Sequence, residues 1–287
     1  MNLKIVPKVR PGHLQSRGHG YSNGVTMVEL LIAVVLAGIV TSAAFSVYIT
    51  QHKQWIVQDE IADMQANIRA ASEELTTQVR MAGQGLPDEF PGGAIWAYNT
   101  NPDTIVIIYD TGALTGVETE QPMAQPSSEL RCDGHDLSGL HDGEWAYIFD
   151  PNNSTGEYFL ASQVDDASDR IFHASMPLSR AYPVGSRIMK LAQKRYYVSG
   201  ADPNHPTFMV QNIGENAEPY AENITTLNIR YVLSSGAVVD VPPRPNMIRE
   251  VLLTIDSRTN RSDTEFQRAY RQRSVTTRAK VRNLGMN

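Results

Sequence analysis

The stretch GVTMVELLIAVVLAGIV, residues 24–40, places one acid, Glu29, in an otherwise apolar run. No charged side chain follows from Leu30 to Thr50, and this segment is long enough for a helix of about 20 residues to cross a bilayer. A carboxylate inside a membrane helix is unfavourable by roughly 2.5 to 3.5 kcal/mol on insertion scales. The segment therefore predicts a membrane-spanning helix in which Glu29 requires a compensating partner.

Positive charge is concentrated ahead of this run. Residues 1–24 contain no acid and four basic side chains, Lys4, Lys8, Arg10 and Arg17. Removing these four charges takes the formal net charge of the chain from −6 to −10. Basic residues stay on the cytoplasmic side of a membrane helix. We therefore expect the N-terminus in the cytoplasm and the chain after about residue 52 on the other side of the membrane.

A second periodic pattern follows the apolar run without a break. No proline occurs from Val25 to Leu86, and apolar residues recur at helical spacing. These residues are Val57, Ile61, Met64, Ile68, Ala71, Leu75, Val79 and Ala82. The opposite face is polar and contains Gln58, Asp59, Asp63, Arg69, Glu73, Glu74 and Arg80. The pattern predicts one helix with a transmembrane half at residues 25–52 and an amphipathic half at residues 53–86, ended by the glycines of Gly83-Gln-Gly85-Leu-Pro87.

The apolar stripe of this helix could contact either a partner helix or the chain's own domain. Charged residues do not flank the stripe in the regular heptad fashion of a coiled coil. We therefore expect the stripe to cover a sheet built by the rest of the chain.

Residues 87–287 have the pattern of a β domain. Runs of β-branched and aromatic residues alternate with turn clusters such as Asp150-Pro-Asn-Asn-Ser154 and Pro242-Pro-Arg-Pro245. The expected strands are residues 104–109, 144–149, 157–160, 187–191, 195–198, 226–232, 250–255 and 274–281. Together with the long helix, these strands predict an α+β fold with a mostly antiparallel sheet domain.

The C-terminal residues 258–287 are basic, with eight Lys and Arg side chains against two acids. Alternation places Arg278, Lys280 and Arg282 on one face of the last strand, opposite Ala279 and Val281. A solvated strand edge that discourages aggregation explains the pattern most simply. An interface with an acidic partner and a site for DNA are the alternatives.

Residues of the kind that bind metals gather in the middle of the chain, in Asp133-Gly-His135-Asp136, His141-Asp142 and Glu144, and in loops at residues 150–157 and 165–169. The spacing from Asp150 does not fit a calcium-binding EF-hand loop, because Thr155 stands where that loop has glycine. We interpret these residues as solvated turns and assign no metal site.

The sequence contains no recognisable catalytic or cofactor motif. It lacks a nucleophile elbow, a phosphate loop and paired cysteines, and Gly83-Gln-Gly85 has no third glycine of a nucleotide fingerprint. The single cysteine, Cys132, cannot form an intramolecular disulfide, and we expect it to be a small buried residue. We predict neither an enzyme nor a bound cofactor.

The basic leader ending at Gly24, followed by Thr26, Glu29 and an apolar run into an amphipathic helix, resembles the type IV pilin family and its pseudopilin relatives. Three further segments are similar to minor pilins of the PilW type, which are related to the J-type pseudopilins of type II secretion. These segments are QANIRAASEELTTQVRMAGQGLP, YAENITTLNIRYVL and SVTTRAKVRNL, which begin at Gln65, Tyr220 and Ser274.

The resemblance implies that residues 1–24 are a leader, which a prepilin peptidase in the inner membrane removes by cutting between Gly24 and Val25. The same enzyme would methylate the new amine of Val25, although Val25 stands where the family most often has phenylalanine or methionine. Glu29, with Thr26 beside it, would act in assembly by attracting the terminal amine of a neighbouring subunit. An α-amino group is largely protonated at neutral pH, so this pairing would provide the partner that Glu29 needs.

The resemblance implies a minor pilin that takes part in assembling or priming a type IV pilus. Its partners would be other pilin subunits, bound through the N-terminal helix, the peptidase and inner-membrane lipid; nucleic acid is not expected. A J-like pseudopilin of a secretion system is the first alternative. The second is a secreted binding protein or hydrolase whose ordinary signal peptide is cut after Ala44, since Ser42-Ala43-Ala44 resembles a small-residue cleavage site.

Overall fold

The computed structural model describes residues 24–88, 90–263 and 269–283. Of the expected leader, only Gly24 belongs to this part, and residues 1–23 lie outside it. Glu265 and Arg268 of the basic C-terminal segment lie outside it as well. The chain divides between Trp55 and Ile56 into two compact units, which are described separately.

One long helix, α1, covers Met27–Met81, and its residues from Ile56 onward belong to the second unit. The chain turns directly after the helix at Gly83 and Gly85, which have positive φ angles of 78° and 70°. Only glycine adopts such angles at little cost. A Cβ atom on Gly85 would lie 2.7 Å from the Cβ of Asp110, so both the angle and the close approach require glycine there.

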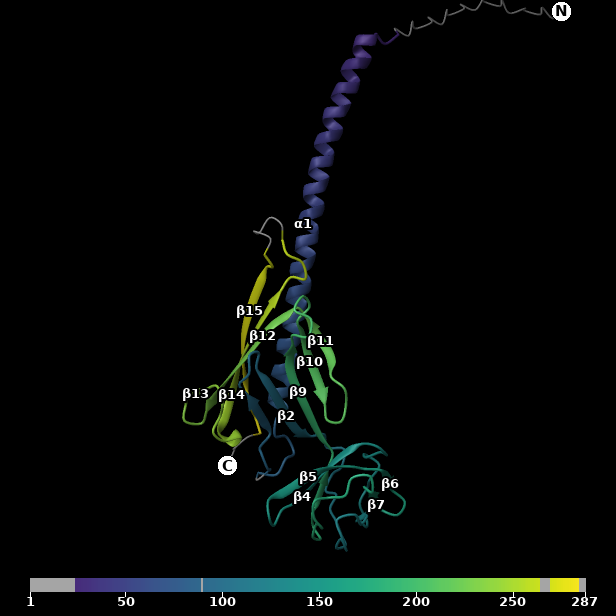
Figure 1. Ribbon diagram of the computed structural model, residues 1–287, viewed down its shortest axis with the longest axis vertical. Coiled ribbons are helices and arrows are strands. Elements are labelled where there is room, and N and C mark those ends of the chain that lie inside the picture. The colour runs from purple at the N-terminus through teal and green to yellow at the C-terminus, as the bar shows by residue number, and fades with distance from the viewer. Residues whose placement is uncertain (1–23, 89, 264–268, 284–287) are drawn as a thin grey trace, which may run out of the picture. The chain divides into compact units, whose positions relative to one another are not determined.

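The second unit contains two larger antiparallel sheets beside α1 (Figure 1). The five-stranded sheet has the order β1-β2-β9-β10-β11. Its strands are β1 (Ile95–Tyr98), β2 (Thr104–Asp110), β9 (Leu191–Ser199), β10 (Thr207–Asn212) and β11 (Glu218–Glu222). The four-stranded sheet has the order β13-β12-β14-β15. Its elements are β12 (Ile224–Leu233), β13 (Val238–Val239), the short helix η1 (Pro245–Met247), β14 (Ile248–Arg258) and β15 (Gln272–Lys280).

The amphipathic half of α1 and both larger sheets share one hydrophobic core. From the helix this core receives Ile68, Ala71, Leu75, Val79 and Ala82. The five-stranded sheet adds side chains such as Ile105 and Phe208, and the four-stranded sheet adds others such as Leu253. The predicted α+β fold, with the helix stripe packed on the chain's own antiparallel sheets, is confirmed.

The prediction is wrong for Glu74, which does not lie on the solvent-exposed polar face of the helix. Its side chain is 17% exposed, and its carboxylate accepts a hydrogen bond of 2.5 Å from the hydroxyl of Tyr196. Lys194 Nζ lies 3.8 Å from the same carboxylate. The buried Tyr196 on β9 needs a partner for its hydroxyl. The five-stranded sheet therefore extends beyond the apolar stripe and partly covers Glu74.

A separate lobe is inserted between β2 and β9, which are neighbours in their sheet. It contains two three-stranded sheets, with the orders β3-β7-β6 and β5-β4-β8 (Figure 1). Its strands are β3 (Leu130–Arg131), β4 (Trp145–Asp150), β5 (Thr155–Leu160), β6 (Gln163–Asp165), β7 (Arg170–Phe172) and β8 (Arg187–Met189). The lobe has its own core, which contains Cys132. Cys132 is therefore buried, as predicted, and burial raises the pKa of its thiol to about 12.

The last strand, β15, lies at one edge of the four-stranded sheet, and within the described ranges β14 is its one neighbour. Arg278, Lys280 and Arg282 are exposed, whereas Ala279 and Val281 are buried in the core. The predicted alternation of a basic outer face and an apolar inner face is therefore confirmed. Arg278 also lies 3.3 Å from Glu250 on the neighbouring strand.

Candidate functional site

The residues that precede α1 are fully accessible. Gly24, Val25 and Thr26 are exposed and are not helical, and α1 begins at Met27. A Cβ atom added to Gly24 would meet no atom of the described residues within 4 Å. The part of the chain that the structure describes therefore leaves space for a larger side chain at position 24.

Thr26 and Glu29 are tied together at the start of the helix. Glu29 Oε2 accepts two hydrogen bonds of 2.9 Å from Thr26, one from its backbone N–H and one from its hydroxyl. In return, the backbone N–H of Glu29 donates to Thr26 Oγ1 at 3.2 Å. This reciprocal arrangement is a capping box, which satisfies backbone donors that the first turn of a helix leaves without partners.

The capping box adds a structural role that the sequence prediction did not assign to these two residues. Its signal is present in the sequence, because Thr26-Met-Val-Glu29 matches the Thr-x-x-Glu spacing ahead of an apolar run. Both bonds to the carboxylate use Oε2, and among the described residues no donor reaches Oε1. Glu29 can therefore cap its own helix and still accept a hydrogen bond from another molecule.

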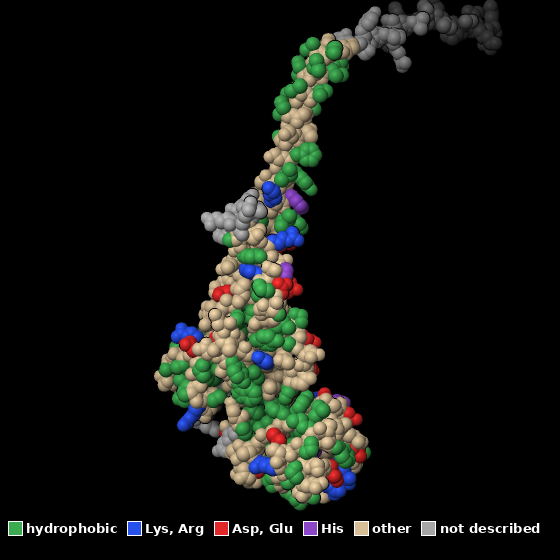
Figure 2. Space-filling model, in the orientation of Figure 1, with side chains coloured by type: hydrophobic (Ala, Val, Ile, Leu, Met, Phe, Trp, Pro, Cys, Tyr) green, Lys and Arg blue, Asp and Glu red, His purple; other side chains and the backbone are tan. Residues whose placement is uncertain are grey.

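The first half of α1 exposes its apolar side chains on every side. Large residues such as Val28, Leu36 and Phe45 remain more than half exposed, and hydrophobic side chains cover the segment in Figure 2. The helix is long and apolar enough to cross a membrane, judged by its length and composition. Apolar surface of this extent is unstable in water, so it requires lipid or other apolar helices around it.

Aromatic rings mark the end of the apolar segment. Tyr48 and His52 stack with their ring centroids 6.0 Å apart, and His52 and Trp55 stack at 6.3 Å. The first charged side chain after Glu29, Lys53, lies among them. Tyr and Trp are enriched where a membrane helix meets water. The rings therefore fit the boundary of a membrane-spanning segment.

The prediction of solvated turns is wrong for Asp150, which ends β4 and is 1% exposed, and for residues 155–157, which belong to β5. Asp142 and Asp169 lie in turns, as the sequence predicts. Their carboxylates accept hydrogen bonds from backbone N–H groups: Asp169 from Gly134 at 2.8 Å, and Asp142 from Val164 at 2.7 Å. Glu144 accepts from the backbone N–H of His141 and forms an ion pair of 2.6 Å with Lys190. These carboxylates hold the loops of the lobe in place.

One group in these loops has the ligand types of a metal site. Glu118, Glu120 and His135 each place a ligand atom within 4.8 Å of the other two. The sequence prediction considered His135 but not the two glutamates, which precede it by more than ten residues. His135 Nε2 lies 3.1 Å from Glu120 Oε1, so these two groups already satisfy each other. We assign no metal to them.

Comparison with known protein families identifies a motif near the start of the chain. Residues 20–45 match the family model of the prokaryotic N-terminal methylation motif, the class III signal peptide of type IV pilins. The matched segment includes Gly24, Val25, Thr26 and Glu29. No curated protein matches the chain.

The motif, together with the apolar helix, supports a type IV pilin-like protein that is anchored in a membrane. Proteins with this motif are structural subunits that associate with other pilins and are processed by a prepilin peptidase.

Proposed function

We propose that this chain is a minor pilin of the PilW type, which takes part in assembling or priming a type IV pilus. The observation that carries the proposal is the methylation motif at residues 20–45, which continues into a helix whose second half forms the core of an antiparallel β domain. In this proposal residues 1–24 are a leader and residues 25–52 are the membrane and assembly segment. Residues 53–86 and 87–287 form the amphipathic helix and the β domain.

Cleavage between Gly24 and Val25 is the first step that we propose. The bond precedes the first helical residue and is exposed, so a membrane peptidase reaches it without unfolding α1. Among the described residues, nothing gives a steric reason for glycine at position 24. Recognition by the peptidase supplies that reason, because glycine leaves room for close approach to the backbone. The new amine of Val25 is then methylated and remains cationic.

Glu29 is the proposed partner for the terminal amine of a neighbouring subunit. Its Oε2 is held by Thr26, whereas Oε1 is open to a further donor. A charge pair is much stronger in a low-dielectric surrounding than in water. Removing one member of a buried pair leaves an uncompensated charge and is strongly unfavourable. Pairing with the amine would thus fix the depth at which each helix docks beside the next.

The location follows from the same elements. We place the N-terminus in the cytoplasm, α1 in the inner membrane and the β domain outside the cytoplasm until the subunit enters a pilus at the cell surface. The four basic residues before the helix support this orientation by the positive-inside rule. The exposed apolar residues of the first half of α1 would contact other pilin helices after leaving the lipid.

The motif and the helix are equally compatible with a J-type pseudopilin, in which the same chemistry would serve a type II secretion system. The secreted binding protein or hydrolase is less well supported. Its cleavage point after Ala44 lies within α1 and within the segment that matches the methylation motif.

The proposal is tested with Glu29→Ala and the matched control Asp59→Ala, which removes an exposed acid farther along the same helix. Each variant is expressed in cells that lack the native protein, and its amounts in the membrane and in sheared pili are compared. We expect Glu29→Ala to insert normally in the membrane and to be lost from pili, with Asp59→Ala unaffected. Normal incorporation of Glu29→Ala would contradict the pairing. Measuring secretion of a type II substrate in the same strains separates the pilus from the pseudopilus.

A further inference from the structure

Among the described residues, no strand pairs with the outer edge of β15, which offers a row of backbone groups without partners in the sheet. At the two ends of the ladder, Thr259 N–H donates to the carbonyl of Arg271 and Val281 N–H donates to the carbonyl of Arg249, both at 2.9 Å. The register between β14 and β15 has no shift between these points. In an antiparallel ladder alternate residues bond to the same neighbour. The odd-numbered residues of β15 therefore bond to β14, and the backbone groups of Ser274, Thr276 and Arg278 face the open edge.

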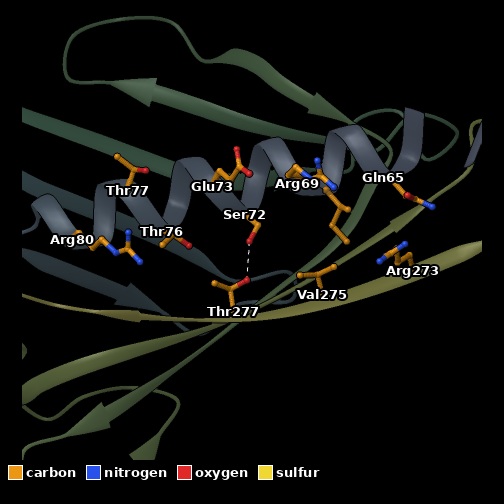
Figure 3. Close-up of a pocket in the computed structure, with 11 residues that line it drawn as sticks. Gln65, Arg69, Ser72, Glu73, Thr76, Thr77, Arg80, Arg273, Val275 and Thr277 are labelled. Atoms are coloured by element: carbon orange, nitrogen blue, oxygen red, sulfur yellow. Dashed lines mark hydrogen bonds between the residues drawn. The ribbon is translucent and has the colours of Figure 1, made fainter. Parts of the chain in front are cut away.

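A groove of about 620 Å³ runs between this strand and α1 (Figure 3). The hydroxyls of Ser72 on the helix and Thr277 on the strand are hydrogen-bonded at 2.9 Å across the groove. A further hollow of about 390 Å³ shares Gln65 and Arg273 with the groove. It extends the groove along the helix toward Ile61.

The groove is positively charged. Arg69 and Arg80 from α1 and Arg273 from β15 line it, and Glu73 is the one acid among its described lining residues. Within the part of the chain that the structure describes, none of the three arginines has a carboxylate within 4 Å. The buried hydroxyl of Thr76, on the same wall, has no hydrogen-bond partner among the residues that the structure describes. The groove thus contains three cations without a carboxylate partner among the described residues.

We propose that this groove binds an extended acidic segment of a partner protein, which adds to the four-stranded sheet beside β15. The partner's backbone would pair with the open edge of β15, and its carboxylates would reach Arg69, Arg80 and Arg273. Addition of a strand to a sheet edge is a common mode of peptide recognition, in which backbone bonds provide affinity and side chains provide specificity.

The spacing of the arginines predicts the pattern of the ligand. Arg69 and Arg80 are eleven residues apart on the helix, which corresponds to about 16 Å at 1.5 Å per residue. A strand covers this distance in about five residues at 3.3 Å each. Because alternate side chains of a strand share a face, acids four or six positions apart can lie near both arginines, and the groove selects acids at every second position over five to seven residues.

A single-stranded nucleic acid fits the groove less well, although its phosphates would also attract the arginines. Proteins that bind single strands usually stack the bases on aromatic side chains, and the described lining residues include none. The alternating N–H and C=O groups of β15 match another peptide backbone.

The test uses the full chain in detergent micelles and a fluorescein-labelled peptide of sequence EVETEVE, with binding measured by fluorescence anisotropy. The double variant Arg69→Gln and Arg273→Gln should weaken binding at least tenfold. The matched control Lys280→Gln removes an exposed cation from the outer face of the same strand and should change binding less than twofold. The corresponding peptide KVKTKVK should not bind.

Backbone pairing is tested separately by hydrogen exchange. Peptide binding should protect the amides of Ser274, Thr276 and Arg278, which face the open edge. Thr276→Pro removes one outward N–H without a bond to β14 and should weaken binding, with an unchanged circular dichroism spectrum as the check on folding. Unchanged exchange at all three amides would overturn the proposal. An equal loss of peptide affinity in Lys280→Gln and in the double variant would also overturn it. Displacement of the peptide by a twelve-nucleotide thymidine strand that binds more tightly would also overturn it, in favour of nucleic acid.

Discussion

Leu75→Ala tests whether the second half of α1 forms the core of the β domain. Leu75 is fully buried between the two larger sheets, with Ala71 and Val79 on the turns either side of it. The substitution removes three carbon atoms, which at about 0.8 kcal/mol per buried methylene correspond to about 2.4 kcal/mol. The cavity left behind adds to this loss, and measured Leu→Ala changes in cores range from about 2 to 5 kcal/mol. We expect a loss of about 3 kcal/mol.

The assay is urea unfolding of the full chain in detergent micelles, followed by tryptophan fluorescence from Trp96 and Trp145 in the β domain. For an m value of about 3 kcal/mol per molar urea, a loss of about 3 kcal/mol lowers the midpoint by about 1 M. Leu36→Ala makes the same chemical change on the exposed first half of α1 and should leave this midpoint unchanged. A shift below about 0.3 M for Leu75→Ala, or equal shifts for both variants, would contradict the packing of the second half of α1 in the core of the β domain.

Three further predictions concern single groups. Burial, with the charge of Glu157 as the next cause, raises the pKa of Tyr182 to about 12. The folded protein therefore holds the Tyr182 proton more tightly than the unfolded chain does. The stability that this proton contributes below pH 10 should be lost between about pH 10 and 12. Thermal unfolding measured against pH tests this, and a melting temperature that does not change over this range would contradict it. Cys132 should not react with Ellman's reagent at pH 8 in the folded protein but should react fully in 8 M urea, whereas equal rates would contradict its burial. Thr26→Ala removes the two hydrogen bonds of the Thr26 hydroxyl, at a cost of about 1 kcal/mol, and should speed exchange of the Glu29 amide about fivefold; an unchanged rate would show that these bonds contribute nothing.

Periodic patterns predicted the parts of the fold in which one face of an element is buried. The spacing of Ile68, Leu75 and Val79 places them on one side of a helix, and the same side is buried in the core. The alternation of Arg278, Ala279 and Lys280 predicted the two faces of β15 in the same way. Burial of one face produces a periodic pattern in the sequence, because each core position selects an apolar residue.

Other features of the fold have a weaker pattern in the sequence. Strands of two or three residues, such as β3 and β6, are too short to show a period, so the separate core of the lobe was not foreseen. In β11 one residue, Ala221, is buried, and the strand contains Pro219, so its sequence does not show the alternation typical of a strand. Glu74 lies beside the stripe, and its burial depends on Tyr196, which is remote in sequence. The capping box was predictable, because its signal depends only on the local spacing of Thr26 and Glu29.

The most direct test of the proposed function is the N-terminus of the mature protein, purified from membranes and analysed by N-terminal sequencing and mass spectrometry. We expect a chain that starts at Val25 and carries one methyl group on its amine. Glu29 would then meet a cation that the uncut chain lacks. A chain that starts at Phe45, or one that retains residues 1–24, would contradict the proposed function.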